Sequence, residues 1–233
     1  MWSEYVSPEN IDLRIWPRVA VVAERLWSPA TVNNVDSMYV RMELAGRRLG
    51  LLGLTHRSNY PVMLERLAGA GNPEMVKTLA DVVEPVKDYA REEFRKYSSS
   101  TPLNRMVDTA ASESLAGREF AREVDALLRG RGDAEAVSRK LTVWRDYAKA
   151  ALPMLASSAL TEETVPVAEN LSAVAAYGLQ ALELLKSGKP ATAAWYKDAA
   201  AAIARAEKPR AELLLMTVAP TKRLVEAVRP AER

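Results

Sequence analysis

The sequence contains no cysteine and a single histidine, His56, which removes two kinds of chemistry. Without cysteine there is no disulfide framework, no thiol nucleophile and no thiolate ligand for a metal. A single histidine excludes zinc sites built from paired imidazoles. We therefore expect neither a metal nor a cofactor. His56 follows Thr55 at an expected turn, and we interpret it as a surface residue.

Long apolar runs and an excess of charge are also lacking. No segment reaches the roughly 20 uninterrupted apolar residues that would span a bilayer. The start of the sequence has no basic region followed by an apolar run, as an export signal would. Lys and Arg number 32 against 30 Asp and Glu, so the net charge is only +2. This balance favours neither nucleic acid nor an anionic membrane as a partner.

The residues that are present predict a mainly α protein. The chain has 233 residues, of which 48% are hydrophobic and 27% charged, enough for one or two cored domains. Apolar residues recur at helical spacing along most of the sequence. The one good strand candidate is the opening segment MWSEYV, which ends at Ser7-Pro8.

The helical pattern changes in composition near residue 58. Before it we expect one helix from about Leu13 to Trp27, with a broad apolar face, and a second from a cap at Asp36 to Gly53. After it the sequence becomes rich in Ala, Leu, Glu, Lys and Arg, the mix typical of a helical bundle. We therefore divide the chain into residues 1–57 and an all-α domain over residues 58–233.

Turn and cap signals subdivide the second domain. Asn72-Pro73 and Glu84-Pro85 predict helix starts, because proline is favoured in the first helical position. The segment from Gly130 to Asp133 predicts a turn between two antiparallel helices. Gly188 is expected to end the following long helix, and Pro220 to break the last one.

Three short motifs occur in order near the start: Trp2-x-Glu4, Trp16-Pro17-Arg18 and Ala23-Glu24-Arg25-Leu26-Trp27. Together they resemble the end of the catalytic barrel in family 20 glycoside hydrolases, the β-N-acetylhexosaminidases. Residues 38–53 resemble the Arg-rich helix that follows, so this resemblance covers about the first 57 residues. LADVVEPVKDY and TPLNRMVD are similar to helical tails appended to some bacterial members. The resemblance implies an incomplete (β/α)8 barrel, represented by its last strand and helix, followed by the helical bundle.

The resemblance assigns binding roles to two residues. Trp2 would stack its indole on the ring of N-acetylglucosamine, and Glu4 would accept hydrogen bonds from the outer hydroxyls. Barrel enzymes carry their functional groups at the carboxyl ends of the strands. Alternate residues of a strand point the same way, so both side chains would face the pocket. An accidental aromatic and a solvated carboxylate near a chain end are the alternative.

Catalysis in the family needs groups that this sequence lacks. The substrate's own acetamido oxygen attacks, an Asp orients it, and an adjacent Glu acts as general acid. No Asp-Glu dipeptide occurs in the sequence, and a complete barrel takes roughly 250 residues. We therefore assign no catalytic residue. We expect this chain to be the C-terminal fragment of a hexosaminidase and to be inactive by itself. It would bind N-acetylglucosamine only as part of a complete barrel. The compartment stays unknown, with a periplasmic or secreted parent enzyme as the expectation.

Two other functions remain open. One is a stand-alone helical bundle that serves as an interaction or scaffold module without enzymatic activity. A third hypothesis is that it complements a separately encoded barrel portion. In each case the apolar face of the helix from Leu13 to Trp27 needs a partner, so we expect it to pack on the helical domain or to drive self-association.

Other aromatic and charged residues receive structural interpretations. Four tryptophans on apolar stripes are expected to pack in the core: Trp16, Trp27, Trp144 and Trp195. Three charged residues of the motif are expected to form ion pairs that tie the helix to the barrel: Arg18, Glu24 and Arg25.

Overall fold

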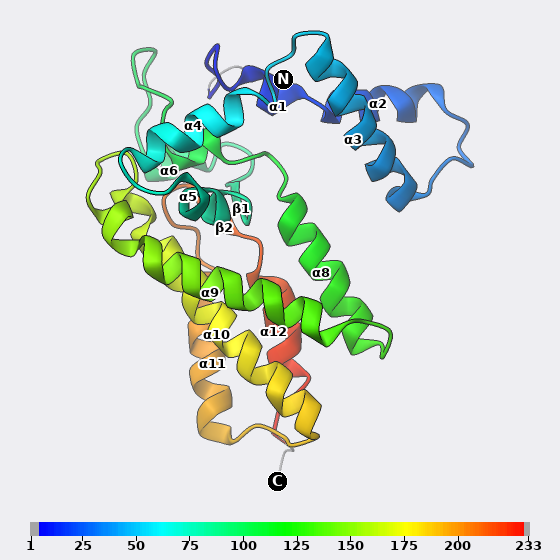
Figure 1. Ribbon diagram of the computed structural model, residues 1–233, viewed down its shortest axis with the longest axis vertical. Coiled ribbons are helices and arrows are strands. Elements are labelled where there is room, and N and C mark those ends of the chain that lie inside the picture. The colour runs from blue at the N-terminus through cyan, green and yellow to red at the C-terminus, as the bar shows by residue number, and fades with distance from the viewer. Residues whose placement is uncertain (1–4, 231–233) are drawn as a thin grey trace.

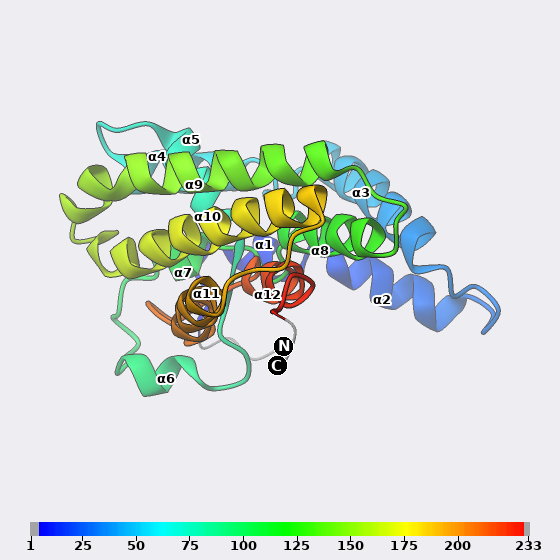
Figure 2. The same ribbon diagram turned by 90° about the horizontal axis from the view of Figure 1, so that it is seen from below.

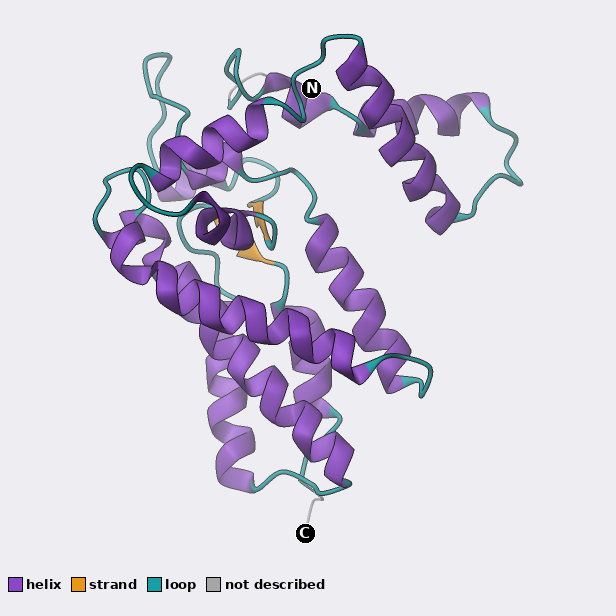
Figure 3. Ribbon diagram, viewed as in Figure 1, coloured by secondary structure: helices purple, strands orange, loops and turns teal. Residues whose placement is uncertain are grey.

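The computed structural model describes residues 5–230, which fold mainly into helices with one small sheet (Figure 3). The mainly α fold expected from the sequence is confirmed. The helices are α1 (Ile11–Ile15), α2 (Arg18–Trp27), α3 (Val35–Leu51), α4 (Asn59–Ala68), α5 (Pro73–Ala80), α6 (Arg91–Phe94), α7 (Met106–Thr109), α8 (Leu115–Leu128), α9 (Ala134–Ala156), α10 (Val165–Ser187), α11 (Ala193–Ala206) and α12 (Val218–Glu226). A 3-10 turn, Glu162–Thr164, precedes α10, and the strands are β1 (Val83–Pro85) and β2 (Leu213–Leu215).

The hydrophobic core lies in the helical part, which comprises α4 to α12. Among the described residues, the members of this core run from Leu64 to Val228. The long helices α9 and α10 lie side by side, and α11 and α12 pack on α10 (Figures 1 and 2). Fully burying a side chain such as Leu141 or Leu171 stabilises a fold by about 1.5–3 kcal/mol. The helical part therefore has the means to hold its own structure.

Gly178 allows three of these helices to approach closely. A Cβ atom at this position of α10 would lie 3.0 Å from Cδ1 of Leu141 in α9 and 3.1 Å from Cγ2 of Thr221 in α12. Both distances are shorter than ordinary van der Waals contact, so a larger residue would require the side chains of Leu141 and Thr221 to shift.

Several helix boundaries follow the signals in the sequence. The Asn72 side chain accepts a hydrogen bond from the Glu74 amide at 2.9 Å and so caps α5. Asp133 caps α9 in the same way, and the turn before it separates α8 from α9 as expected. Gly188 ends α10 with φ of 66°, the left-handed conformation that glycine adopts without steric cost.

Two expectations for the helical part are wrong. Glu84-Pro85 belongs to β1, not to a helix start, because residues 83–85 pair antiparallel with Leu213–Leu215 of β2. In this two-stranded sheet both strands are edges, where a proline without an N–H is tolerated. Pro220 does not break the last helix, since it lies in the first turn of α12, where backbone N–H groups have no helical partner.

The first part of the chain also departs from expectation. The helix expected from Leu13 to Trp27 is two helices, α1 and α2, separated at Trp16-Pro17. Trp16 has an extended backbone, as a residue before proline prefers. The cap of α3 is Asn34, whose side chain accepts a bond from the Ser37 amide at 2.8 Å, not Asp36.

The helices α1, α2 and α3 lie at one end of the molecule, beside α4 and α8 (Figure 1). None of the residues of α2 is buried, and Leu26 is 79% exposed. Val19 and Val22 are exposed as well, so this apolar face does not pack on the helical part. Self-association through it stays a prediction.

Some expectations are not tested. Trp2, Glu4 and most of the expected first strand lie outside the described residues, and Tyr5 and Val6 are not part of a strand. The domain boundary near residue 58 stays a prediction. Within residues 5–230 no helix is long and apolar enough to cross a membrane.

Candidate functional site

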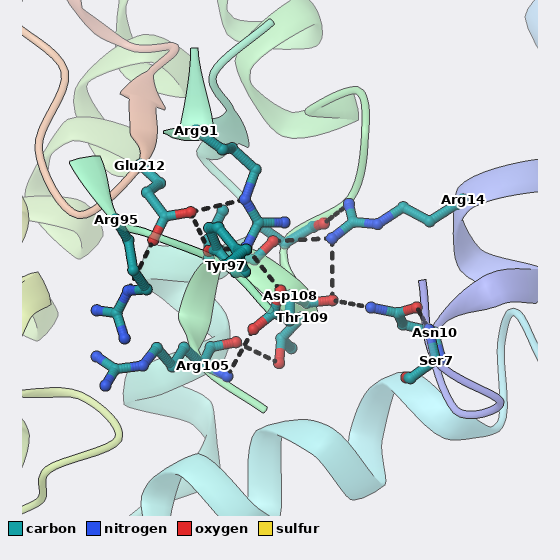
Figure 4. Close-up of polar contacts among 12 residues, drawn as sticks. Ser7, Asn10, Arg14, Arg91, Arg95, Tyr97, Arg105, Asp108, Thr109 and Glu212 are labelled. Carbon is teal, nitrogen blue, oxygen red and sulfur yellow. Dashed lines mark hydrogen bonds and ion pairs between the residues drawn. The ribbon is translucent and has the colours of Figure 1, made fainter. Parts of the chain in front are cut away.

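A buried polar cluster joins the start of the described chain to the helical part (Figure 4). We call it the Arg91 cluster, and it consists of Tyr5, Arg91, Tyr97, Asp108 and Glu212. Arg91 is 3% exposed, and its guanidinium contacts Asp108 Oδ1 at 2.8 Å and Glu212 Oε2 at 2.6 Å. Two carboxylates thus compensate a cation that would be very unfavourable in this position alone.

Local structure places each charged member of the cluster. Arg91 begins α6, and Asp108 lies in α7, where its Oδ2 accepts a bond from the Arg105 amide at 3.0 Å. Glu212 lies directly before β2 with φ of 62°. Its carbonyl accepts a bond from the Val86 amide at 2.9 Å, which continues the pairing of β1 and β2. Such a backbone conformation persists only where the surrounding contacts fix it.

Two tyrosines enclose the arginine. The Arg91 Cζ atom lies 4.4 Å from the ring centroid of Tyr5 and 5.0 Å from that of Tyr97. The two rings meet edge to face with centroids 4.8 Å apart. Cations over aromatic faces are attracted by the ring quadrupole, and more strongly when water is excluded. Tyr5 is therefore held by the helical part through its ring.

The electrostatics favour the charged state of Arg91. Burial lowers the pKa of Arg91, but the carboxylates of Asp108 and Glu212 outweigh it and raise the pKa overall. Burial raises the pKa of Tyr97, and the hydrogen bond from its hydroxyl to Glu212 raises it further. The tyrosine therefore keeps its proton and donates a hydrogen bond to the carboxylate that also pairs with Arg91.

Arg14 and Asn10 form a second anchor beside the cluster. Arg14 donates hydrogen bonds to the carbonyls of Ala110 and Val107, both at 2.8 Å, and of Asp108 at 3.1 Å. The Asn10 side chain also donates to the Asp108 carbonyl, at 3.4 Å. A cation is favoured here because the last carbonyls of a helix lack helical partners. Burial, with the nearby charge of Arg91, lowers the pKa of Arg14 to about 10.

A third set of contacts joins the same segment to α4 and to Thr55, which precedes that helix. Asp12 accepts hydrogen bonds from the Thr55 amide at 2.7 Å and from its hydroxyl at 3.0 Å. The Asn59 side chain donates to the Glu9 carbonyl at 2.8 Å, and Arg66 pairs with both carboxylate oxygens of Glu9. The chain between Tyr5 and Arg14 is therefore fixed by polar contacts along its length.

Tyr39 makes a similar contact elsewhere in the first part. The Cζ atom of Arg118 in α8 lies 3.6 Å from the centroid of the Tyr39 ring in α3. The Tyr39 hydroxyl donates a hydrogen bond to Glu113. This second tyrosine-arginine pair joins α3 to α8 of the helical part, and neither of its residues belongs to the Arg91 cluster.

A cleft of about 400 Å³ lies between the first helices and the helical part, and His56 is among its lining residues. The histidine is 6% exposed, so its interpretation as a surface residue is wrong. It lies against Gly46 of α3, where a Cβ would be 3.4 Å from its Nε2. Burial, with the nearby charge of Arg57, lowers the pKa of His56. Within residues 5–230 no group of three or more metal-binding side chains gathers.

Comparisons with known proteins agree on one family. The model of the glycosyl hydrolase family 20 catalytic domain matches residues 1–30. The β-hexosaminidase subunit beta of Mus musculus is 37% identical over 60 residues, which are 26% of this chain and 11% of that protein. The subunit alpha of Bos taurus is 50% identical over 42 residues, which are 18% of this chain and 8% of that protein.

A solved structure extends the likeness to the helical part. The chitobiase of Flavobacterium johnsoniae superposes with a TM-score of 0.85 at 28% identity, over 97% of this chain and 34% of that chain. The chain carries a region related to the family 20 β-hexosaminidases. It spans about a tenth of the mouse relative and a third of the chitobiase.

The family 20 region contains both of the expected sugar-binding residues, Trp2 and Glu4. They lie outside the described residues, so their roles stay predictions. The nearest described residue, Tyr5, belongs to the Arg91 cluster. The residue that directly follows the expected sugar contacts in the sequence therefore belongs to a buried polar network.

The structural residues of this region are only partly as expected. Trp144 is buried, and Trp16 and Trp195 are partly buried, but Trp27 is 90% exposed and its expected core position is wrong. Trp27 is the last residue of α2, which packs on α3.

The expected ion pairs of the region also differ. Glu24 accepts two hydrogen bonds from Arg41 of α3, from Nε at 2.7 Å and from Nη2 at 2.6 Å. Arg25 donates to the Val32 carbonyl at 3.2 Å instead of pairing with an acid. These contacts hold α2 against α3.

Sequence reasoning missed the Arg91 cluster entirely. Asp108 and Glu212 are 17 and 121 residues away from Arg91 along the chain. No periodicity or spacing joins residues so far apart. The nearest signal is the family-like segment TPLNRMVD, which contains Asp108 but does not identify its partner.

Proposed function

We propose that this chain is the C-terminal part of a β-N-acetylhexosaminidase, an enzyme that hydrolyses terminal N-acetyl-hexosamine residues. In it, the family 20 region forms one wall of the sugar pocket, with Trp2 and Glu4 as ligand contacts, and the helical part supports that wall. The observation that carries this proposal is the superposition on a chitobiase over 97% of the chain. The match of residues 1–30 to the family 20 catalytic domain supports it independently.

We also propose that the chain alone does not catalyse this hydrolysis. Its support is the sequence, which has no Asp-Glu dipeptide to orient the acetamido group and donate a proton. N-acetylglucosamine would be recognised only where the remaining walls of the pocket are present, because a single stacked wall buries little of a ligand. The net charge of +2 supports neither nucleic acid nor a membrane as a further partner.

The barrel portion of such an enzyme is the proposed partner of α2 and α3. Val22, Leu26 and Trp27 of α2 are exposed, as are Val40 and Leu44 of α3. Exposed apolar surface beyond a few hundred Å² usually marks an interaction site. We use the term completed enzyme for this chain joined to a family 20 barrel portion that carries the Asp-Glu pair.

The inactivity of the chain alone is tested with an aryl β-N-acetylglucosaminide. We expect no hydrolysis above background by the purified chain. Glu4→Gln is the matched control, since it preserves size while removing the proposed acceptor charge. Hydrolysis by the wild-type chain that this substitution abolishes would overturn the proposed inactivity.

A stand-alone scaffold module is a second candidate, and one observation favours it. The described core lies wholly within the helical part, from Leu64 to Val228, without residues of the family 20 region. The scaffold proposal predicts a cooperative thermal transition, no affinity for N-acetylglucosamine, and no gain of hydrolysis on addition of a barrel portion. Gain of hydrolysis would decide for the enzyme fragment.

A further inference from the structure

We propose that the cleft beside His56 binds a small neutral molecule with an apolar body and one amide-like head group, which forms a hydrogen bond with the imidazole. The cleft has a volume of about 400 Å³, and the residues expected to contact sugar are not among its lining residues. This inference does not rest on the proposed function, because every residue that it uses lies in the described part of this chain.

The apolar walls of the cleft come from several separate helices. Leu13 belongs to α1, Met42 to α3, Ala80 to α5 and Leu115 to α8, and Trp16 adds an indole. The volume lies within the range of about 300–1,000 Å³ that is typical of pockets for small molecules. Such pockets occur preferentially where two packed units meet. The lining therefore favours a ligand whose body is apolar.

His56 is a buried polar side chain in this lining. It is 6% exposed, and within residues 5–230 neither Nδ1 nor Nε2 has a hydrogen-bond partner. Burial lowers the pKa of His56, and the nearby Gly46 backbone opposes this effect without forming a hydrogen bond of regular geometry. Buried polar groups usually have partners, because an unmade hydrogen bond leaves the cost of desolvation uncompensated. The unused nitrogens therefore indicate a ligand that supplies the missing partner.

The imidazole determines which head group fits. A neutral imidazole has one N–H donor and one acceptor nitrogen. An amide also carries both a donor and an acceptor, so it can form a hydrogen bond with either ring nitrogen of His56. A purely apolar ligand would leave both nitrogens without a partner.

The charges around the cleft favour a neutral ligand over an ion. Both signs of charge occur in the lining, which includes Arg18, Arg57, Glu43, Asp81 and Glu113. Arg57 pairs with Glu43 at 2.9 Å. Asp81 accepts a hydrogen bond from the Tyr60 hydroxyl at 2.7 Å. These groups need no counterion from a ligand, and removal of an ion from water is unfavourable unless the ion gains a partner.

The test compares three probes that share one aromatic ring: benzamide, benzoate and toluene. Shifts of the cleft amide resonances in two-dimensional NMR spectra of this chain give the dissociation constants, at about pH 8, where His56 is neutral. We expect a dissociation constant on the order of 1 mM for benzamide and binding about fivefold weaker for the other two, the value of one neutral hydrogen bond. Absence of saturation at about ten times that benzamide concentration, or equal affinity for all three probes, would overturn the inference.

His56→Phe removes the two nitrogens and keeps a ring in the wall. We expect benzamide to lose its advantage, so that benzamide and toluene bind within about twofold of each other. Because the buried nitrogens have no partner within the described residues, the urea midpoint should be unchanged or raised. A retained preference for benzamide would contradict the role of His56, and so would a fall in the urea midpoint, because the fold itself would then use the imidazole.

Leu115→Trp tests the cleft without changing His56. Leu115 lines the cleft and is 49% exposed, so a larger side chain can be accommodated at the surface while it narrows the cleft. Leu128→Trp is the matched control, because Leu128 ends the same helix, is 38% exposed and is not a lining residue. We expect benzamide to bind at least about fivefold more weakly to Leu115→Trp, and within about twofold of wild type to Leu128→Trp. Equal affinities of the two variants would locate the probe elsewhere and refute the proposed site.

The completed enzyme distinguishes a small molecule from a barrel side chain as the occupant. With the barrel portion joined, benzamide should still shift the cleft amide resonances. If the barrel portion abolishes these shifts, a barrel side chain fills the cleft and the inference is wrong. Absence of hydrolysis by the completed enzyme would contradict the proposed function alone, since the binding measurements on this chain do not depend on catalysis.

Discussion

His56 illustrates how packing changes the chemistry of a single side chain. The imidazole is buried beside Gly46, and this burial, with the charge of Arg57, lowers the pKa of His56 below its usual 6.5. The folded chain therefore takes up the proton at lower pH than the unfolded chain does. The contribution of neutral, buried His56 to the free energy of unfolding is fully present above pH 6.5. It is lost as the pH falls from 6.5 through the folded-state pKa.

The single histidine makes this effect measurable. We expect the imidazole Hε1 resonance to titrate below pH 6.5 in the folded chain. In His56→Gln, the free energy of unfolding should lose the part of its pH dependence that lies between 6.5 and the folded-state pKa. Titration of the folded chain at or above 6.5 would contradict the assigned burial.

Arg91 is expected to be far more important for stability than a surface arginine. Arg91→Met leaves Asp108 buried without its cation and leaves Glu212 only the longer ion pair with Arg95 at 3.4 Å, so we expect a loss of about 3–5 kcal/mol in the free energy of unfolding. Arg47, which pairs with Glu43 on an exposed face of α3, provides the control. Arg47→Ala should change stability by less than about 0.5 kcal/mol in the same urea titration. A loss below about 1 kcal/mol for Arg91→Met would show that the cluster is not tightly fixed.

At the scale of secondary structure, local signals succeed where they act on the backbone directly. The side chains of Asn72 and Asp133 cap the helices that follow them, and Gly188 ends α10. They fail where a tertiary contact decides, as at Pro85, whose strand is defined only by pairing with β2. Pro17 was expected inside a helix, although the restriction it places on Trp16 predicts the observed break.

The exposed face of α2 gives a prediction at this scale. Val22 and Leu26 are exposed, so Val22→Lys combined with Leu26→Lys should leave the free energy of unfolding within about 0.5 kcal/mol of wild type. We expect the wild-type chain alone to self-associate through this face and the double variant to stay monomeric. Sedimentation velocity over a range of concentrations measures the difference. If both proteins sediment as monomers at every concentration, the exposed apolar face of α2 does not drive self-association.

At the scale of the whole molecule, composition and periodicity predict a mainly α chain, and the sequence motif identifies the family 20 region. The placement of that region on the helical part was not predictable. It depends on contacts such as Arg14 with the end of α7 and Tyr5 with Arg91, whose partners are remote in sequence. For the same reason the Arg91 cluster could not be predicted, while Trp2 and Glu4 could be proposed as sugar contacts because their motif is local.

The central claim is that this chain supplies one wall of a sugar pocket whose catalytic groups belong to a barrel portion. The most direct measurement is the initial rate of hydrolysis of an aryl β-N-acetylglucosaminide by the chain, by the barrel portion and by the completed enzyme. We expect hydrolysis only by the completed enzyme, with kcat/KM reduced at least about tenfold by Glu4→Gln. Full activity of the barrel portion without this chain, or none in the completed enzyme, would contradict the claim.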